Sequence, residues 1–362
     1  MTRGYNFGAG PAMLPEPLLV EAQNELLDWQ GTGMSVMEAG HRTQEFDTLM
    51  KRAESNLRQL IGIPDNYHVL FMGGAARTQF AVIPMNFLGK KQFGGYLVTG
   101  IWSEFAFDEA KKLKAAYCVT SGKSEGFTRI PTADQWEIKK DSTYIYYTPN
   151  ETVNGIRLPE PPKTHGIPLI ADMTSCLLSE PIQVADYDLI FAGAQKNIAN
   201  SGLTLVIVSD RLLETIKDPA LPTMLDYRTY SESHSLYATP PTFNCYMADK
   251  MFQWILDEGG VEALYQRNLE KAKRLYHYID SSDFYQCKID PPYRSIVNVC
   301  FSLTQSALEE LFLTQAKTRG LLALKGHRFV GGLRASMYNS MPMAGVDALI
   351  QFMSDFAKEH PL

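Results

Sequence analysis

Short apolar segments alternate with amphipathic ones over the first two thirds of the sequence, and this alternation leaves few possible folds. Segments rich in Val, Ile, Leu and Tyr predict strands, whereas apolar residues three or four positions apart predict helices between them. Such a succession is typical of an α/β fold, in which helices cover a mostly parallel sheet. We expect helices at 18–29, 46–61, 76–88 and 103–114 and strands at 67–72, 96–99, 143–147, 167–171, 188–193 and 203–208.

The sequence changes in character after about residue 258. A long charged segment predicts a helix, and Ser306 and Glu309 have the spacing of a capping box that opens a later helix ending near Gly320. The expected elements here are helices at 261–280 and 345–358 and strands at 296–301, 321–324 and 333–338. Since 362 residues are enough for two domains, we expect a large domain over 16–258 and a small α+β domain formed by 1–15 and 259–362.

The composition excludes several classes of protein. A formal net charge of -6 makes binding to nucleic acid or to an anionic membrane surface unexpected, because both need a concentrated basic surface. The five cysteines are widely spaced and form no CxxC pair, so neither a disulfide framework nor a zinc site is indicated. The first residues contain no apolar segment typical of a secretory signal, and no stretch is apolar enough to span a bilayer. We therefore expect a cytoplasmic protein.

Polar residues follow two of the predicted strands. The segment IPLIAD ends in Asp172, and DLIFAGAQK ends in Gln195 and Lys196. Parallel strands deliver residues from their carboxyl ends into the crevice where ligands bind, so the acid and the lysine are expected to face one cleft. A salt bridge that caps the sheet is the alternative reading of this pair, and short motifs alone do not decide between the two.

A glycine pair precedes another expected helix. In FMGGAARTQF a strand leads into Gly73-Gly74 and then into a helix whose first turn holds Arg77. Free N–H groups and the positive end of the helix dipole make such a helix start a phosphate site. A cation there is unfavourable unless an anion lies beside it, so Arg77 indicates an anion. An ordinary glycine turn with a solvated arginine is the alternative.

Trp102 and Thr152 follow two further strands, with Trp102 placed just before a helix expected to start at Ser103. Either residue alone is explained by packing or turn chemistry. Together with the glycine loop, the acid and the lysine, they match what pyridoxal phosphate requires. A lysine holds the aldehyde of this cofactor as a Schiff base, and an acid keeps its pyridine nitrogen protonated so that the ring accepts electrons. The lysine must also lose its proton readily, which burial and a nearby cation promote.

At this point the sequence resembles the phosphoserine aminotransferases, which belong to the class V aminotransferases of fold type I. The resemblance is carried in order along the chain by NFGAGPAMLPEPLL, SVMEAGHR, FAGAQKNIANSGLTLVIV, TPPTF and ALKGHRFVGGLRASMYN. It implies a large domain with a mostly parallel seven-stranded sheet and a smaller C-terminal α+β domain.

The resemblance also implies how pyridoxal phosphate is held. Lys196 bonds covalently to its aldehyde and later moves the proton of the substrate, while Asp172 pairs with the pyridine nitrogen. Trp102 stacks on the ring and Thr152 bonds its phenolic oxygen. The residues expected around the cofactor phosphate are Ala76, Arg77 and Gln195, together with Ala238 and Thr239, of which Thr239 reaches the site of the partner subunit in a homodimer.

For the substrates, the resemblance implies that Arg334 forks onto the α-carboxylate, a geometry that suits a planar guanidinium. The second anion, a phosphate or the γ-carboxylate of glutamate, is expected in a cage assembled across the dimer interface from His41, Arg42, Arg77, His327 and Arg328. The implied ping-pong reaction converts L-glutamate and 3-phosphohydroxypyruvate into 2-oxoglutarate and O-phospho-L-serine. Bacterial members also act on a phosphorylated hydroxythreonine in pyridoxine synthesis.

Three positions depart from the family pattern. Ala238 stands where many members have Asn, Gly40 stands where Ser is usual before His-Arg, and Ala75-Ala76 stand in a loop that is richer in glycine elsewhere. The missing Asn side chain removes one hydrogen bond to the cofactor phosphate, and a neutral hydrogen bond contributes roughly 0.5–1.5 kcal/mol.

Three rival functions make different demands on the sequence. A cysteine desulfurase of the same fold needs an exposed nucleophilic cysteine, whereas Cys245 and Cys300 both lie in segments that predict core packing. A non-catalytic protein that binds pyridoxal phosphate or phosphoserine would not need the lysine, the acid and the whole anion cage. A nucleotide-binding dehydrogenase would carry GxGxxG after its first strand, which this sequence lacks.

Overall fold

The computed structural model describes residues 3–113, 115–216 and 220–361 of the chain. Its centre is a seven-stranded sheet with the order β2-β10-β9-β8-β5-β3-β4, in which only β10 runs antiparallel to its neighbours. The strands are β2 (Tyr67–Gly73), β3 (Phe93–Val98), β4 (Ala115–Ser121), β5 (Tyr144–Tyr147), β8 (Leu169–Asp172), β9 (Leu189–Gly193) and β10 (Leu203–Ser209). The predicted mostly parallel α/β sheet is therefore confirmed.

Both faces of this sheet are buried under helices, which explains why its central strands are apolar throughout. Alternate residues of one strand serve opposite faces: Phe71 packs into one hydrophobic cluster and its neighbour Leu70 into the other. On one face lie α1 (Glu16–Asn24), α2 (Gln44–Ile61) and α7 (Thr242–Asp257). On the other lie α3 (Gln79–Phe87), α4 (Ile101–Leu113), α5 (Asp210–Leu213) and α6 (Tyr227–Glu232).

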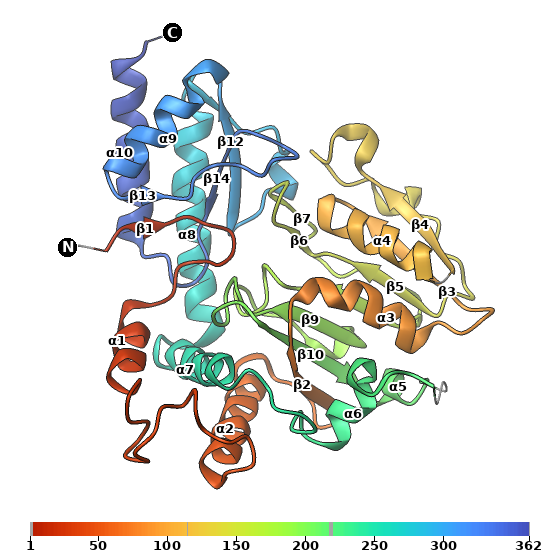
Figure 1. Cartoon of the computed structure of the whole chain (residues 1–362). Helices are drawn as coiled ribbons and strands as arrows, with labels where there is room; N and C mark the ends of the chain where they lie inside the picture. The colour runs from red at the N-terminus through yellow and green to blue at the C-terminus, as the bar shows by residue number, and fades with distance from the viewer. Residues whose placement is uncertain (1–2, 114, 217–219, 362) are drawn as a thin grey trace.

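The C-terminal part has its own hydrophobic cluster, drawn in blue beside the large sheet in Figure 1. Its antiparallel sheet has the order β11-β12-β14. Phe7, from the start of the chain, is fully buried in this cluster, and β1 (Tyr5–Asn6) pairs in parallel with β13 (Leu321–Leu322). The other elements are α8 (Gly260–Asp280), β11 (Tyr285–Gln286), β12 (Asn298–Leu303), α9 (Glu309–Thr318), β14 (Leu333–Ser336) and α10 (Met343–Glu359).

Two of the sequence predictions about helices are wrong. The first helix ends at Asn24 rather than near residue 29, because local bonds hold the following residues in turns: Gly33 N–H donates to Asp28 (2.8 Å) and Trp29 N–H donates to the Met34 carbonyl (2.8 Å). The capping box at Ser306 does not form. Ser306 lies inside a short 3₁₀ turn that precedes α9, and no side chain caps either element.

Strand β4 was not among the predicted strands. It lies at an edge of the sheet and several of its residues are only half buried, and its sequence AAYCVTS begins with two alanines, which are depleted in strands. In the described part of the chain, no helix combines the length and the apolar character that crossing a membrane requires.

Candidate active site

A cavity of about 190 Å³ lies at the carboxyl ends of the central strands. Strand β8 ends at Asp172, and its parallel neighbour β9 ends at Gly193, shortly before Lys196. The two strand ends therefore deliver the acid and the lysine into one space, as predicted. The lining residues are Ala75, Ala76, Arg77, Phe80, Trp102, Thr148, Asn150, Thr152, Asp172, Thr174, Ser175, Gln195 and Lys196.

Lys196 is buried with 9% of its surface exposed, and its amine donates a short hydrogen bond to the Thr152 hydroxyl. The amine lies 5.8 Å from the centroid of the Trp102 ring. Burial lowers the pKa of Lys196 to about 8; the positive charge of Arg334 acts in the same direction, and the carboxylate of Asp172 opposes both. A substantial fraction of this amine is thus neutral near pH 8, as a nucleophile requires.

Asp172 is held by Thr174, a residue that the sequence analysis did not single out. The Thr174 N–H donates to the Asp172 carboxylate (3.0 Å), and the Thr174 hydroxyl accepts from the Gly193 N–H (3.2 Å). Burial raises the pKa of Asp172, while the hydrogen bonds from Thr174 and the charge of Lys196 lower it. A further positive charge placed in the cavity would stabilise the ionised form of this carboxylate.

Trp102 lies in the first turn of α4, because this helix begins at Ile101 and not at Ser103 as expected. The ring faces the cavity from the helix start, whereas Thr152 follows the short strand β6 (Asn150–Glu151). Both residues line the cavity, together with three further polar residues that the sequence analysis did not single out, namely Thr148, Asn150 and Ser175.

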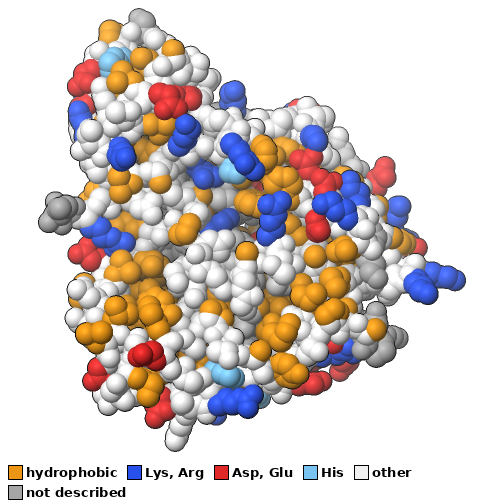
Figure 2. Space-filling model, in the orientation of Figure 1, with side chains coloured by type: hydrophobic (Ala, Val, Ile, Leu, Met, Phe, Trp, Pro, Cys, Tyr) orange, Lys and Arg blue, Asp and Glu red, His pale blue; other side chains and the backbone are white. Residues whose placement is uncertain are grey.

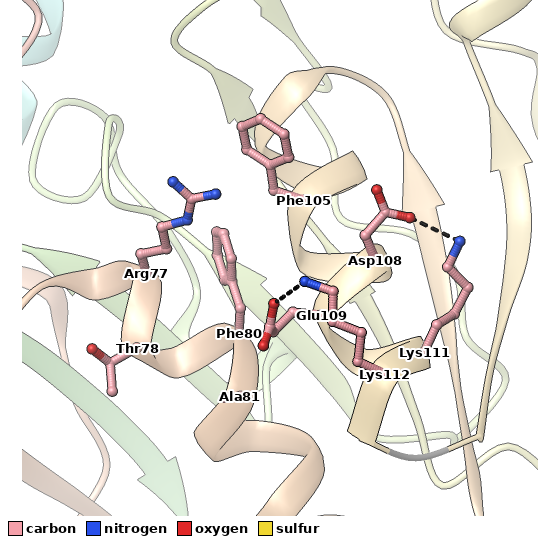
Figure 3. A pocket seen from close by; sticks show the side chains of 9 residues that line it. All are labelled: Arg77, Thr78, Phe80, Ala81, Phe105, Asp108, Glu109, Lys111 and Lys112. Atoms are coloured by element: carbon pink, nitrogen blue, oxygen red, sulfur yellow. Dashed lines mark hydrogen bonds and ion pairs between the residues drawn. The ribbon is translucent and has the colours of Figure 1, made fainter.

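Arg77 lies in a 3₁₀ turn (Ala76–Thr78) that leads directly into α3, and no side chain caps the start of this turn. Its guanidinium lies 4.8 Å from the centroid of the Phe105 ring, and both side chains are drawn in Figure 3. The predicted helix start with an arginine in its first turn is therefore present beside the cavity.

A larger open groove of about 930 Å³ runs between α3 and α4, beyond Arg77. Its charged side chains pair with one another, Lys111 with Asp108 (2.8 Å) and Lys112 with Glu109 (3.0 Å), as Figure 3 shows. Despite its larger volume, this groove contains no buried titratable group. The chemistry belongs to the smaller cavity, which gathers Lys196 and Asp172.

The N-terminal segment packs directly on the lysine. Ala12 N–H donates to the Gln195 carbonyl (2.9 Å), and a Cβ on Gly10 would lie 3.2 Å from the Gln195 side chain and 3.4 Å from that of Lys196. The glycines of NFGAGP thus permit a close approach of the chain to Gln195 and Lys196.

Arg334, on β14, approaches the cavity from the C-terminal part. One of its Nη atoms lies 3.5 Å from the Thr152 carbonyl, and its buried Nε has no hydrogen-bond partner in the described part of the chain. His327 and Arg328 lie in the loop before β14. The pKa of His327 is lowered by partial burial and by the charges of Arg334 and Arg328.

The same loop meets the large sheet through aromatic rings. Phe329 lies 5.9 Å from Phe105, ring centroid to centroid, and Phe105 is the ring beside Arg77. Figure 2 shows Lys and Arg side chains gathered at the centre of this face, between the C-terminal part and the helices that cover the large sheet. Arg77, His327, Arg328 and Arg334 therefore approach one region from both parts of the chain.

Seven predicted site residues do not line the cavity within this chain: three are His327, Arg328 and Arg334, described above, and the other four are His41, Arg42, Ala238 and Thr239. His41 and Arg42 contact each other (3.4 Å) at the surface, Ala238 is half-buried and Thr239 is exposed. The roles of these residues remain predictions, since they were expected to act on the site of a partner subunit.

The cavity fits pyridoxal phosphate by the chemistry of its lining. Among the described residues, the indole N–H of Trp102 and the hydroxyl of Thr148 are buried without a hydrogen-bond partner. The uncapped turn at Ala76 adds backbone N–H groups for an anion, and Lys196 and Asp172 supply the amine and the acid. Unsatisfied polar groups of this kind are expected where a polar ligand binds.

The two cysteines considered for a desulfurase behave differently. Cys245 is fully buried in α7, as predicted. The prediction that Cys300 packs in the core is wrong, because it is partly exposed and lines a second cavity together with Arg334. Burial nevertheless raises the pKa of Cys300 to about 12, so this thiol is not a ready nucleophile.

Comparison with known proteins agrees with this geometry. The family described as aminotransferase class-V matches residues 4–349. A phosphoserine aminotransferase of Legionella pneumophila (strain Lens) is 61% identical over 359 residues, covering 99% of each chain. The solved phosphoserine aminotransferase of Bacillus circulans subsp. alkalophilus superposes with a TM-score of 0.96 at 42% identity, covering 99% of each chain.

A second solved structure carries the cofactor in its description. The phosphoserine aminotransferase of Trichomonas vaginalis, with bound PLP, superposes with a TM-score of 0.92 at 39% identity and covers 97% of this chain and all of its own. The family match, the high identity over nearly the full length and the shared fold all lead to the same assignment. The chain belongs to the class V aminotransferase family and, within it, to the phosphoserine aminotransferases.

Proposed function

We propose that the protein transfers the amino group of L-glutamate to 3-phosphohydroxypyruvate, giving 2-oxoglutarate and O-phospho-L-serine, with pyridoxal phosphate as cofactor. The observation that carries this proposal is the buried lysine with a lowered pKa beside a buried aspartate, in a cavity approached by arginines that form no ion pair with any described residue. When bound, the cofactor supplies an aldehyde and a ring that accepts electrons. The chain supplies position, charge and proton transfer.

Lys196 performs two tasks in this reaction. Its amine, partly neutral because it is buried, is the group that would hold the cofactor covalently through the cofactor's aldehyde. Its second task, when it does not hold the cofactor, would be to take the proton from the substrate Cα and pass it to the cofactor. The Thr152 hydroxyl holds the nitrogen in place for both tasks.

Asp172 stabilises a protonated ring nitrogen, because its buried carboxylate has no arginine partner among the described residues and Thr174 fixes its orientation. Trp102 covers one face of the cavity and excludes water from it. Ala76, Arg77 and Gln195 line the cavity and would hold the cofactor phosphate, with Arg77 the only cation of the three.

Arg334 orients the substrate through its α-carboxylate. Its Nε is buried without a partner in the described chain, and its guanidinium lies next to Thr152, close to where Cα must lie to meet Lys196. His327, Arg328 and Arg77 face the other end of the substrate. A phosphate accepts more hydrogen bonds and carries more charge than a carboxylate, so this cluster favours the phosphorylated substrate.

We further propose a homodimer in which His41, Arg42, Ala238 and Thr239 act on the partner's site, because none of them lines the cavity of its own chain. The division into a large domain, 16–258, and a small one, 1–15 with 259–362, is supported by the separate hydrophobic cluster that contains Phe7. A cytoplasmic location agrees with five free cysteines. A parallel activity on phosphorylated hydroxythreonine, as in pyridoxine synthesis, needs the same two anion sites.

The test adds O-phospho-L-serine and L-glutamate to separate samples of the yellow holoenzyme. Each is expected to abolish the yellow absorption in a single turnover, and each keto acid is expected to restore it. L-alanine, which lacks a second anion, is the control and should react far more slowly. Equal rates with alanine and phosphoserine would contradict the proposal.

A further inference from the structure

Trp102 lies at the start of α4, where side chains bind the free backbone N–H groups. Most of these side chains belong to residues outside the helix, and one is that of Ser103. A helix start leaves its first N–H groups without intrahelical partners. Here the Ile101 N–H donates to the Asn154 side chain (3.1 Å), while the Trp102 and Ser103 N–H groups donate to the two oxygens of Glu151 (2.9 and 2.8 Å). Glu151 therefore binds the helix through both carboxylate oxygens.

Glu151 and Asn154 flank the residue that contacts the lysine. Thr152, between them, accepts the hydrogen bond from Lys196 through its hydroxyl and lies 3.5 Å from Arg334 through its carbonyl. One short segment thus touches the helix that bears Trp102 on one side and the lysine on the other. We call Glu151 and Asn154 the 151/154 clamp.

The burial of Glu151 is unexpected for a purely structural carboxylate. Only 1% of its surface is exposed, and it forms no ion pair with any residue in the described ranges. Burial raises the pKa of Glu151 to about 7, although its hydrogen bonds with Ser103 and Trp102 act in the opposite direction. Burying a carboxyl group without a cation beside it destabilises the fold. The hydrogen bonds of Glu151 to α4 are what can offset this free energy.

The neighbouring glycine supports the same conclusion. A Cβ on Gly100, immediately before α4, would lie 2.5 Å from Glu151 Cγ and Cδ. The Gly100 N–H is already bound by the Ser103 side chain (3.1 Å), so the helix start has little freedom to move away. Glycine at this position permits the contact that the clamp requires.

We infer that Glu151 is a positioning residue, which fixes the Trp102 ring relative to Thr152 and Lys196 so that the cofactor ring enters a preformed slot. The inference rests on the proposed function, because Trp102 needs this position only to cover the cofactor. Glu151 itself does not line the cavity and touches neither cofactor nor substrate.

The test compares Glu151→Ala and Glu151→Gln with the wild type as holoenzymes. We expect the dissociation constant for pyridoxal phosphate to rise about tenfold in Glu151→Ala, as the loss of one or two charge-assisted hydrogen bonds implies. Glu151→Gln keeps one acceptor and should show a smaller rise. The visible circular dichroism of the bound cofactor should weaken in both, since it reports how firmly the ring is held.

Glu104→Gln is the matched control, because it removes a carboxylate from the same helix whose ion pair, among the residues that the structure describes, is with the exposed Lys123. Gly100→Ala should reproduce the effect of Glu151→Ala by displacing the helix start, and it carries the test if Glu151→Ala does not fold. Affinity and dichroism unchanged in both Glu151→Gln and Gly100→Ala would overturn the inference, as would an equal loss in Glu104→Gln.

Amide hydrogen exchange separates this inference from the proposed function. Exchange at Trp102 and Ser103 should accelerate in the Glu151 variants with or without added cofactor. A wild type that binds no pyridoxal phosphate would contradict the proposed function alone. Unchanged exchange at these two amides would overturn the clamp alone.

Discussion

The pKa of Lys196 controls how fast the protein captures its cofactor. With a pKa of about 8 rather than 10.5, roughly a quarter of the amine is neutral at pH 7.5 instead of about one part in a thousand. The neutral fraction that can attack the aldehyde of pyridoxal phosphate is therefore roughly two hundred times larger than that of an ordinary lysine, and capture is expected to be faster for this reason. The difference corresponds to about 3 kcal/mol, most of it from burial.

The neighbouring charges should move this pKa in opposite directions. Removal of a carboxylate destabilises the charged amine, so Asp172→Asn should lower the pKa of Lys196. Removal of a cation has the reverse effect, so Arg334→Met should raise it. Both directions follow from the charges that surround the amine in the cavity.

The assay is stopped-flow absorbance of cofactor capture by the cofactor-free protein at saturating pyridoxal phosphate, from pH 6 to 10. N-acetyl-lysine, measured in parallel, corrects for titration of the cofactor itself. The midpoint of the wild-type profile is expected near 8, with the two variants displaced to opposite sides. A midpoint near 10 in the wild type, or the same displacement in both variants, would refute the reasoning.

Three further outcomes are expected. Arg328→Ala should slow the phosphoserine half-reaction at least tenfold more than the glutamate half-reaction, because a phosphate uses more of its hydrogen bonds; equal losses in stopped-flow traces would argue against phosphate recognition. Lys271→Met should lower the free energy of unfolding by about 3 kcal/mol in urea titrations, because three carbonyl acceptors (Met337, Tyr338 and Met341) lose their buried donor, whereas exposed Lys273→Met should change little. Dilution until sedimentation shows monomers should abolish activity, and an active monomer would contradict the shared site.

The sequence predicted the residues of the site better than the contacts that hold them. Asp172 and Lys196 were predictable because parallel strands end at one edge of a sheet, and the rule does not depend on distant residues. The hydrogen bonds of Glu151 to α4 were not predictable, since they join segments 48 and 49 residues apart and leave no local pattern. Thr174 is similar, because its role depends on which strand lies beside β8.

Two of the failed predictions have different physical causes. The apolar spacing up to residue 29 suits a helix. Side-chain and backbone hydrogen bonds at Asp28 and Trp29 hold this segment in turns instead. Cys300 had apolar neighbours along the chain, yet its strand lies beside a cavity that another part of the chain completes. Periodicity describes a residue's own element and not what packs against it.

Mapping the covalent attachment site is the most direct test of the central claim, which is that Lys196 holds the cofactor. The holoenzyme is reduced with borohydride, digested and analysed by mass spectrometry. The account predicts the reduced cofactor on Lys196 alone, with none on Lys271, a second buried lysine whose pKa is lowered. Attachment to Lys271 or to any other lysine would contradict it.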